Sequence, residues 1–402
     1  MRIGILTYHR SYNYGAFMQC YSLTTRLKND FPDCEVEVID ILSKEVYRTY
    51  HSNLKNHISL IFDADSNIKR KRYTKSFLLY LKNKISGTTK KNANNKYFDE
   101  AVQQLPLSNR FIISDDLNEL SEYINNRYDI VVVGSDAVWN FQMRPFPNIY
   151  FLGETIKTKK LSYAASSYAQ PFKNLPENQL SHIRNAWRSF EYIGVRDIPT
   201  EDFVKFADAN LIPHHNCDPT VFLDMEKLEP YKERVYEKLL KSGFDPNKKT
   251  IGIMMNSSFV SNIRECLTDE YQLVSVYKSS PFSDINLMDI NPYEWAVCFS
   301  FFDMTVTDYF HGNLLSLKNA TPTLVIEKRT PYNNSYNSKI RDVMERLNML
   351  ENCYFEGEIK AVVLKSKIDE LINTDKNRIL QEIQNEAVYY NSFKTELQKI
   401  IC

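Results

Sequence analysis

Cysteines in this chain of 402 residues are few, scattered and odd in number. The seven cysteines form no CxxC pair. That spacing argues against a zinc site and against a disulfide framework. We therefore expect no bound metal and no disulfide, and we take the reducing cytoplasm as the default location.

Long apolar runs, an excess of one charge and the common cofactor motifs are also missing. No run approaches the roughly 20 apolar residues of a membrane span, and the first 15 residues are typical of a strand and a loop, not of a signal peptide. Lys plus Arg and Asp plus Glu both number 50, so net charge gives no reason to expect a nucleic-acid partner. No P-loop, GxGxxG or Ser-His-Asp motif is found, and we expect no cofactor.

What the chain does contain is a series of short apolar runs that alternate with helical patterns. Examples are "RIGILTY", "EVEVIDI", "DIVVVGSD" and "KLSYAAS" in the first half, and "KTIGIMMN", "YQLVSVY", "MTVT" and "TPTLVIE" in the second. Near-continuous apolar strands that alternate with helices indicate buried parallel sheets. Two such series predict an α/β fold with two Rossmann-like domains.

The proline-interrupted stretch "CDPTVFLDMEKLEPYKERV" separates the two series. We predict an N-terminal domain over 1–225 and a C-terminal domain over 226–360. The remaining residues, 361–402, have a helical pattern, and we expect this tail to cross back to the first domain.

Residues 66–98 differ from their surroundings because they hold ten Lys or Arg and no acidic residue. One interpretation is a solvated pair of helices with a mobile loop over 87–92. The other is a lid or a patch that faces an anionic substrate or the inner surface of a membrane.

Polar residues follow the first and third apolar runs, where ligands bind in open parallel sheets. After the first run, Asn13, Tyr14 and Gly15 could contact sugar hydroxyls, or Asn13 could cap the next helix. The candidates after the "DIVVV" run could bind an acceptor or serve the architecture, with a tryptophan that could stack on a sugar or pack a domain edge. These candidates are Ser135, Asp136, Trp139 and Asn140.

Arg196 and Asp197 stand at the end of the "EYIGV" run. An arginine there could grip phosphate or carboxylate with its two-pronged guanidinium. The alternative is an Arg196–Asp197 ion pair that only holds the loop.

His311, Gly312 and Asn313 lie where the run "MTVT" gives way to a helical pattern. The free N–H groups and the dipole of a helix N-terminus favour an anion, and a histidine there can add a hydrogen bond, a charge or a proton. A lone histidine is more often structural, but this position favours a functional one. At the end of the following run, Lys328 and Arg329 could grip a phosphorylated substrate or form a plain surface cluster with Glu327.

Six phrases in order resemble those of one known family. They are "NYGAFMQCYSL", "GSDAVWN", "SYAAS", "GVRD", "DPTVFL" and "TDYFHG", and the corresponding phrases of the polysaccharide pyruvyl transferase family are similar to NYGA-x-LQ, GSDQVWN, SYAAS, SVRE, DPT-x-L and TDSFHG. The resemblance runs from Met1 to about Met349 and is to the bacterial, GSDQVWN-type members.

The resemblance implies a glycosyltransferase-B-like architecture and the transfer of pyruvate from phosphoenolpyruvate to a sugar of a surface polysaccharide or of its lipid-linked precursor. The product would be a cyclic ketal, with phosphate released. His311 matches the family's histidine and would be the acid or a phosphate ligand, and Arg196 matches the family's arginine and would clamp the donor. In the first domain, the residues that would then face the acceptor are Asn13, Tyr14, Asp136 and Trp139.

The chain departs from the family pattern at Tyr309, Asn313, Ala137 and Asp197, which leaves the choice of acceptor open. Two other functions remain as alternatives. One is a nucleotide-sugar-dependent glycosyltransferase of the same architecture, which would need a base pocket and a ribose-binding carboxylate. The other is a non-catalytic protein of polysaccharide assembly.

Overall fold

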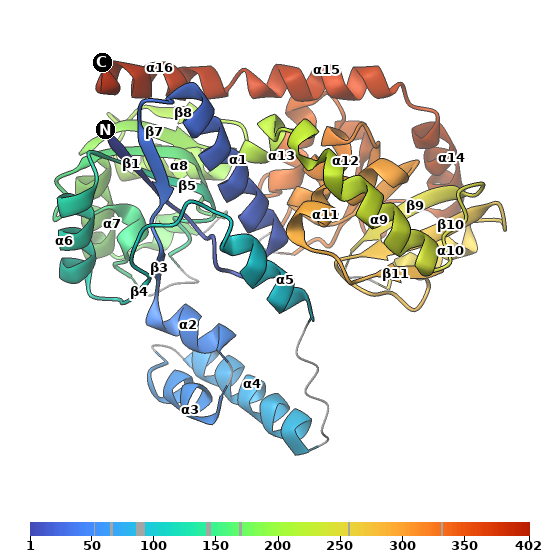
Figure 1. Ribbon diagram of the computed structural model, residues 1–402, viewed down its shortest axis with the longest axis horizontal. Helices are drawn as coiled ribbons and strands as arrows, with labels where there is room; N and C mark the ends of the chain where they lie inside the picture. The colour runs from blue at the N-terminus through green and yellow to red at the C-terminus, as the bar shows by residue number, and fades with distance from the viewer. Residues whose placement is uncertain are drawn as a thin grey trace.

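Two parallel sheets, each of six strands, form the body of the protein in the computed structural model (Figure 1). The structure describes residues 1–51, 53–64, 67–85, 93–141, 146–168, 171–255, 258–330 and 333–402. Every pair of neighbouring strands in both sheets is parallel. The prediction of an α/β fold with parallel sheets is thus confirmed.

The first sheet has the order β2-β1-β5-β6-β7-β8. Its strands are β1 (Arg2–Leu6), β2 (Glu35–Val38), β5 (Ile130–Asp136), β6 (Lys159–Ala165), β7 (Phe190–Val195) and β8 (Pro213–His215). The helices between them are α1 (Tyr14–Asp30), α5 (Ala93–Val102), α6 (Leu117–Arg127), α7 (Glu177–Trp187) and α8 (Ile198–Ala207). The apolar run of β5 is fully buried, as expected for a central strand covered on both faces.

The second sheet has the order β11-β10-β9-β12-β13-β14. Its strands are β9 (Lys249–Met254), β10 (Tyr271–Val276), β11 (Ile285–Leu287), β12 (Met304–Thr307), β13 (Thr323–Glu327) and β14 (Cys353–Phe355). The accompanying helices are α9 (Glu229–Lys241), α10 (Val260–Glu265), α11 (Pro292–Cys298), α12 (Phe310–Lys318) and α13 (Lys339–Arg346). A short 3-10 helix, η3 (Pro219–Phe222), connects the two halves and contacts both α1 and α12.

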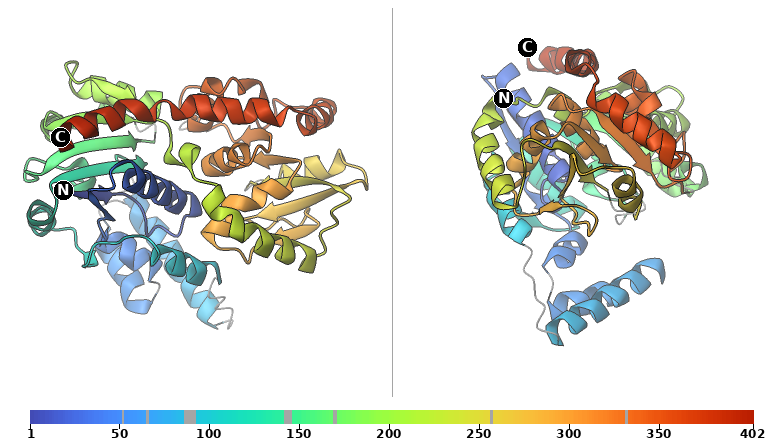
Figure 2. Two further views of the ribbon diagram at one scale, coloured as in Figure 1. Left: turned by 45° about the horizontal axis from the view of Figure 1, so that its top comes forward. Right: turned by 90° about the vertical axis from the view of Figure 1, so that its right-hand side faces the viewer.

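The C-terminal helices α14 (Ala361–Ile372), α15 (Lys376–Ala387) and α16 (Tyr390–Ile401) lead from the second sheet to the first. Figure 1 shows α15 and α16 along the upper side of both halves, and the left view of Figure 2 agrees. The hydroxyl groups of Tyr192 on β7 and Ser392 on α16 are 2.8 Å apart, and Lys394 pairs with Asp30 at 2.9 Å. With these contacts we propose the division into 1–225, 226–360 and a returning tail, 361–402.

Three helices leave the first domain between the two strands of a small sheet, β3 (Ile41–Leu42) and β4 (Ile112–Ile113). They are α2 (Lys44–Tyr50), α3 (Leu54–Phe62) and α4 (Asn67–Ile85), and they project away from the body in both figures. The basic segment predicted over 66–98 includes α4 and the start of α5, while the loop predicted over 87–92 lies outside the described residues. Within the described part of the chain, none of the helices combines the length and the apolar character that a membrane span requires.

The substitution Phe393→Ala should lower the free energy of unfolding by about 3–5 kcal/mol, the usual cost of removing a buried phenylalanine ring. Phe393 is fully buried, and its ring lies 4.8 Å from that of Tyr163 on β6. Urea unfolding followed by circular dichroism measures the change. Val388→Ala, at a side chain that is 61% exposed, is the control and should change it by less than about 0.5 kcal/mol. Equal effects of the two substitutions would contradict the packing of α16 on the first sheet.

Candidate active site

The carboxyl ends of strands from both sheets meet at one pocket of about 280 Å³ between the two halves. This is the edge at which open parallel sheets bind their ligands. The first half contributes Tyr168, which follows β6, and Asp197 and Pro199, which follow β7. The lining residues from the second half are Asp308, Glu327, Lys328, Thr330, Asn333, Asn337, Lys339 and Ile340.

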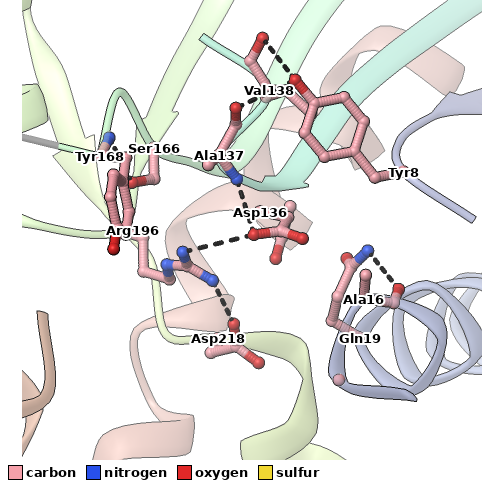
Figure 3. Close-up of polar contacts among 12 residues, drawn as sticks. Tyr8, Ala16, Gln19, Asp136, Ala137, Val138, Ser166, Tyr168, Arg196 and Asp218 are labelled. Carbon is pink, nitrogen blue, oxygen red and sulfur yellow. Dashed lines mark hydrogen bonds and ion pairs between the residues drawn. The ribbon is translucent and has the colours of Figure 1, made fainter. Parts of the chain in front are cut away.

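A buried carboxylate, that of Asp218, joins the two halves next to this pocket. Arg196, just after β7, donates from Nη1 to Asp218 Oδ2 at 2.7 Å, and His311 Nε2 on α12 is 3.6 Å from the same oxygen. On its other side, Arg196 Nη2 lies 3.8 Å from Asp136 Oδ1 at the end of β5 (Figure 3). Arg196 and Asp218 are each 2% exposed or less, so the pair is shielded from water.

Charge pairing dominates the protonation of this cluster. Burial alone would raise the pKa of Asp218, but the opposing charges of His311 and Arg196 outweigh burial and hold this pKa well below its usual value. Burial likewise lowers the pKa of Arg196, and the nearby carboxylates of Asp218 and Asp136 more than compensate. Asp218 is therefore a fixed negative charge that faces both the arginine and the histidine.

His311 occupies the first turn of α12, where the N–H groups have no acceptor within the helix. Its Nε2 is buried and has no hydrogen-bond partner among the described residues. A Cβ atom on Gly15 would lie 2.2 Å from His311 Nδ1, so the glycine lets the first-domain loop approach the imidazole. A Cβ atom on Gly312 would lie 2.6 Å from Met254 Sδ, so this glycine lets α12 pack against the end of β9.

Two lysines supply positive charge within the pocket. Lys328 is exposed and Lys339 is half-buried at the start of α13. Lys339 Nζ lies 5.1 Å from the ring centres of both Tyr168 and Phe310, and it has no ion-pair partner in the described part of the chain. Burial and the charge of Arg196 lower the pKa of Lys339. An anion that binds beside Lys339 would favour the protonated form of this lysine, so the position suits an anionic ligand.

The structure corrects several residue roles. Trp139 is fully buried among core aromatics, with its indole N–H donated to the carbonyl of Tyr150, so the prediction that it meets a sugar is wrong. Tyr14 is also buried, and its hydroxyl donates to the Ile290 carbonyl. Both side chains pack in the core. An amphipathic ring next to a strand end can be buried with its polar atom hydrogen-bonded as readily as it can line a binding surface.

Three more predicted residues have structural partners. Asn13 accepts from the N–H groups of Gly15 and Ala16 and caps α1, which was the alternative interpretation. The Asn313 amide oxygen accepts from the Thr323 hydroxyl inside the second domain, away from the pocket. Arg329 pairs with Glu358 and lies over the ring of Phe355, so it does not line the pocket as expected.

The remaining predicted residues lie near the cluster. Asp136 reaches Arg196, while Ser135 and Asn140 are buried beside it in the chain. The Arg196–Asp197 ion pair, which was the alternative interpretation, is not formed, because Asp197 caps α8 through Thr200 and the arginine pairs with Asp218 instead.

Sequence reasoning missed Asp218 and Lys339 as site residues. Asp218 stands in the "DPT" phrase, which was part of the family pattern, so that phrase was the available signal. Lys339 is at the first position of a helix in a polar stretch, and nothing in the sequence distinguishes it from a surface lysine.

The architecture is of the glycosyltransferase-B-like class, with a site between two parallel-sheet halves. The fold is similar to that of UDP-GlcNAc 2-epimerase from Methanocaldococcus jannaschii, with a TM-score of 0.52 and 10% identity over 98% of this chain and 99% of that chain. It is also similar to that of a putative UDP-N-acetylglucosamine 2-epimerase from Listeria monocytogenes, with a TM-score of 0.51 and 10% identity over 99% of this chain and 97% of that chain. At such identities the similarity shows the fold alone.

The sequence then places the chain within this class. The model of the family described as polysaccharide pyruvyl transferase matches residues 13–327, well over half of the chain. The protein therefore belongs to the polysaccharide pyruvyl transferase family, which is a family of enzymes. A comparison with curated proteins by sequence gave no match.

Replacing Asp218 with asparagine should lower the free energy of unfolding at neutral pH by about 3–5 kcal/mol, because it leaves a buried arginine without its charged partner. The depressed pKa of Asp218 means that its contribution is complete above the ordinary aspartate pKa of about 4 and is lost as the pH falls below it. The difference in the free energy of unfolding between wild type and D218N should therefore become smaller as the pH is lowered below about 4.

Urea unfolding at a series of pH values measures this gap. Asp224→Asn is the control, because Asp224 is near the surface, where it forms an ion pair with Lys227 at 3.7 Å and accepts from the Glu226 N–H. A D218N gap that stays constant on acidification would show that Asp218 does not carry the stabilising charge.

Proposed function

We propose that the enzyme transfers pyruvate from phosphoenolpyruvate to a sugar of a polysaccharide or of its lipid-linked precursor, closing a cyclic ketal and releasing phosphate. The observation that carries the proposal is the His311–Asp218–Arg196 cluster beside a pocket that holds two further cations. This is a small, cationic site with a proton-carrying group at its edge, as the donor requires.

Donor recognition needs positive charge for a phosphate and a carboxylate. Lys328 and Lys339 line the pocket, and the first turn of α12 supplies N–H groups toward an anion. The guanidinium of Arg196 lies 4.7 Å above the ring centre of Phe310, the first residue of α12. Its Nε and Nη2 have no hydrogen-bond partner among the described residues, so two donors remain for a ligand oxygen.

In the proposed reaction, His311 gives a proton to the methylene carbon of the donor. This leaves an oxocarbenium-like centre, which a sugar hydroxyl attacks, and the proton of that hydroxyl returns to the imidazole. The second hydroxyl of the acceptor then displaces phosphate, which leaves with the proton of that hydroxyl, and the ketal closes with the methyl group that the first proton made. Asp218, 3.6 Å from His311 Nε2, stabilises the protonated imidazole and orients it.

Acceptor binding is assigned to the loops of the first domain that reach this cluster. Gly15 contacts the imidazole side of the site, and Asp136 faces Arg196 from the end of β5. Asp136 adopts a left-handed backbone conformation, with φ of 78°, which is uncommon outside functional turns. We infer that its carboxylate takes a hydrogen bond from an acceptor hydroxyl.

His311→Ala should reduce the rate of phosphate release from phosphoenolpyruvate with an acceptor sugar by about 10²–10⁴-fold, the usual contribution of a positioned acid. Arg196→Lys should reduce it as well, because a lysine keeps the charge but loses the planar fork. A coupled phosphate assay with a panel of acceptor sugars measures both.

His214→Ala is the control, because His214 is an exposed histidine on β8. Thermal unfolding of each variant separates loss of the fold from loss of the reaction. Folded His311→Ala and Arg196→Lys proteins that release phosphate at the wild-type rate would overturn the proposal.

Lys339→Gln should raise the KM for phosphoenolpyruvate by at least about tenfold, equivalent to roughly 1.4 kcal/mol of lost anion binding. The matched control is Arg329→Gln, because Arg329 is a cation of the next loop that faces Glu358 instead of the pocket. Steady-state kinetics on both variants measure the difference. A larger rise in KM for Arg329→Gln than for Lys339→Gln would contradict this assignment and would show that Arg329, the residue predicted from the sequence, binds the donor.

A further inference from the structure

The projecting helices α2, α3 and α4, residues 44–85, form a helical arm outside both sheets (Figures 1 and 2). The arm has its own small interior. Glu45 on α2 accepts from Tyr73 at 2.6 Å and pairs with Lys69 at 3.1 Å, and the rings of His57 and Tyr80 are 4.7 Å apart. These contacts fix one face of α4 against α2 and α3 and leave its other face outward.

Positive charge is concentrated on the arm. Residues 44–85 hold ten Lys or Arg and three Asp or Glu, although the whole chain holds 50 of each sign. Six of the basic residues are exposed on α4 and have no ion-pair partner in the described part of the chain. These six are Arg70, Lys71, Arg72, Lys75, Lys82 and Lys84.

The arm also exposes large apolar side chains, and Leu78 and Leu79 stand three or four residues from Lys75 and Lys82, on the same side of α4. Leu78 and Leu79 are 60% and 57% exposed, Ile85 at the end of α4 is 88% exposed, and Phe62 at the end of α3 is 79% exposed. Leucines interleaved with lysines are typical of helices that lie at a lipid interface, where the apolar groups enter the acyl boundary and the long basic side chains reach the headgroups. Charge alone would suit any polyanion, but the exposed leucines favour a bilayer.

We propose that the helical arm binds the surface of an anionic lipid bilayer through the outward face of α4. The basic residues attract the negative headgroups within a Debye length of the surface. The exposed apolar side chains then leave water on contact with the membrane.

The arm is attached to the acceptor side of the candidate active site. Tyr50 at the end of α2 donates to the Ser11 carbonyl at 2.7 Å, and its ring lies 5.0 Å from that of Tyr12. Ser11 and Tyr12 lead directly to Gly15, which touches His311. A docked arm would therefore hold the acceptor loop near the bilayer, where a lipid-linked acceptor would be anchored. This consequence rests on the proposed function, whereas the membrane binding does not.

Flotation of the full chain with vesicles tests the proposal. We expect binding to vesicles of phosphatidylcholine and phosphatidylglycerol in equal parts, little binding to phosphatidylcholine alone, and weaker binding at high salt. Changing Lys71, Arg72, Lys75 and Lys82 together to glutamine should lower the affinity at least about tenfold. Leu78→Ser with Leu79→Ser should lower it about tenfold as well.

A matched control neutralises four basic residues on the second domain, and it should bind as wild type does. These control substitutions are Lys227→Gln, Arg234→Gln, Lys241→Gln and Lys248→Gln. Phosphate release with a water-soluble acceptor reports on the body of the enzyme, so its loss would concern the proposed function and not the arm.

Three results would overturn the membrane proposal. The first is equal binding of wild type to both vesicle types, and the second is wild-type affinity of the arm variants. The third is concentration-dependent dimerisation that the leucine substitutions abolish without any vesicle binding, which would assign the surface to a second copy of the chain.

Discussion

The buried carboxylate of Asp218 is the contact on which the rest of the site depends. It holds Arg196 from the first sheet at 2.7 Å and faces His311 from the second at 3.6 Å. Burying a charge away from water is unfavourable unless the charge is paired. Here the partners of Asp218 come from separate halves of the protein. Asp218 also starts η3, the link between the halves. One residue therefore couples the relative position of the two sheets to the orientation of the imidazole.

The close packing of loops from both halves gives the site its shape. Gly15 has no side chain that would collide with the imidazole, and the cations of Arg196 and Lys339 lie 4.7 Å and 5.1 Å from the ring centre of Phe310. Aromatic faces attract cations without neutralising them. The pocket thus keeps positive charge available for a ligand, even though carboxylates also line its wall. Pyruvyl transfer from a doubly anionic donor is compatible with this balance.

Much of the fold could be predicted from the sequence, because apolar strand runs that alternate with helices leave few other arrangements. The placement of His311 at a helix N-terminus also followed from local pattern. The roles of Asp218 and Trp139 did not. An aspartate before a proline predicts a residue that caps the start of a local helix, and Asp218 does cap η3. Its pairing with a histidine 93 positions later exists only in the tertiary structure. The position of Trp139 after a strand end suggested a ring that stacks on a sugar, but the structure buries this ring completely in the core.

The measurement that tests the central claim most directly is the nuclear magnetic resonance spectrum of the histidine side chains, labelled with nitrogen-15, during titration with phosphoenolpyruvate. His311 is identified by the signal that His311→Ala removes. The account predicts that phosphoenolpyruvate shifts this signal and leaves that of His214 in place, because the anion binds beside the α12 N-terminus and Asp218. A His311 signal that does not shift with phosphoenolpyruvate but shifts with a nucleotide sugar would contradict the account.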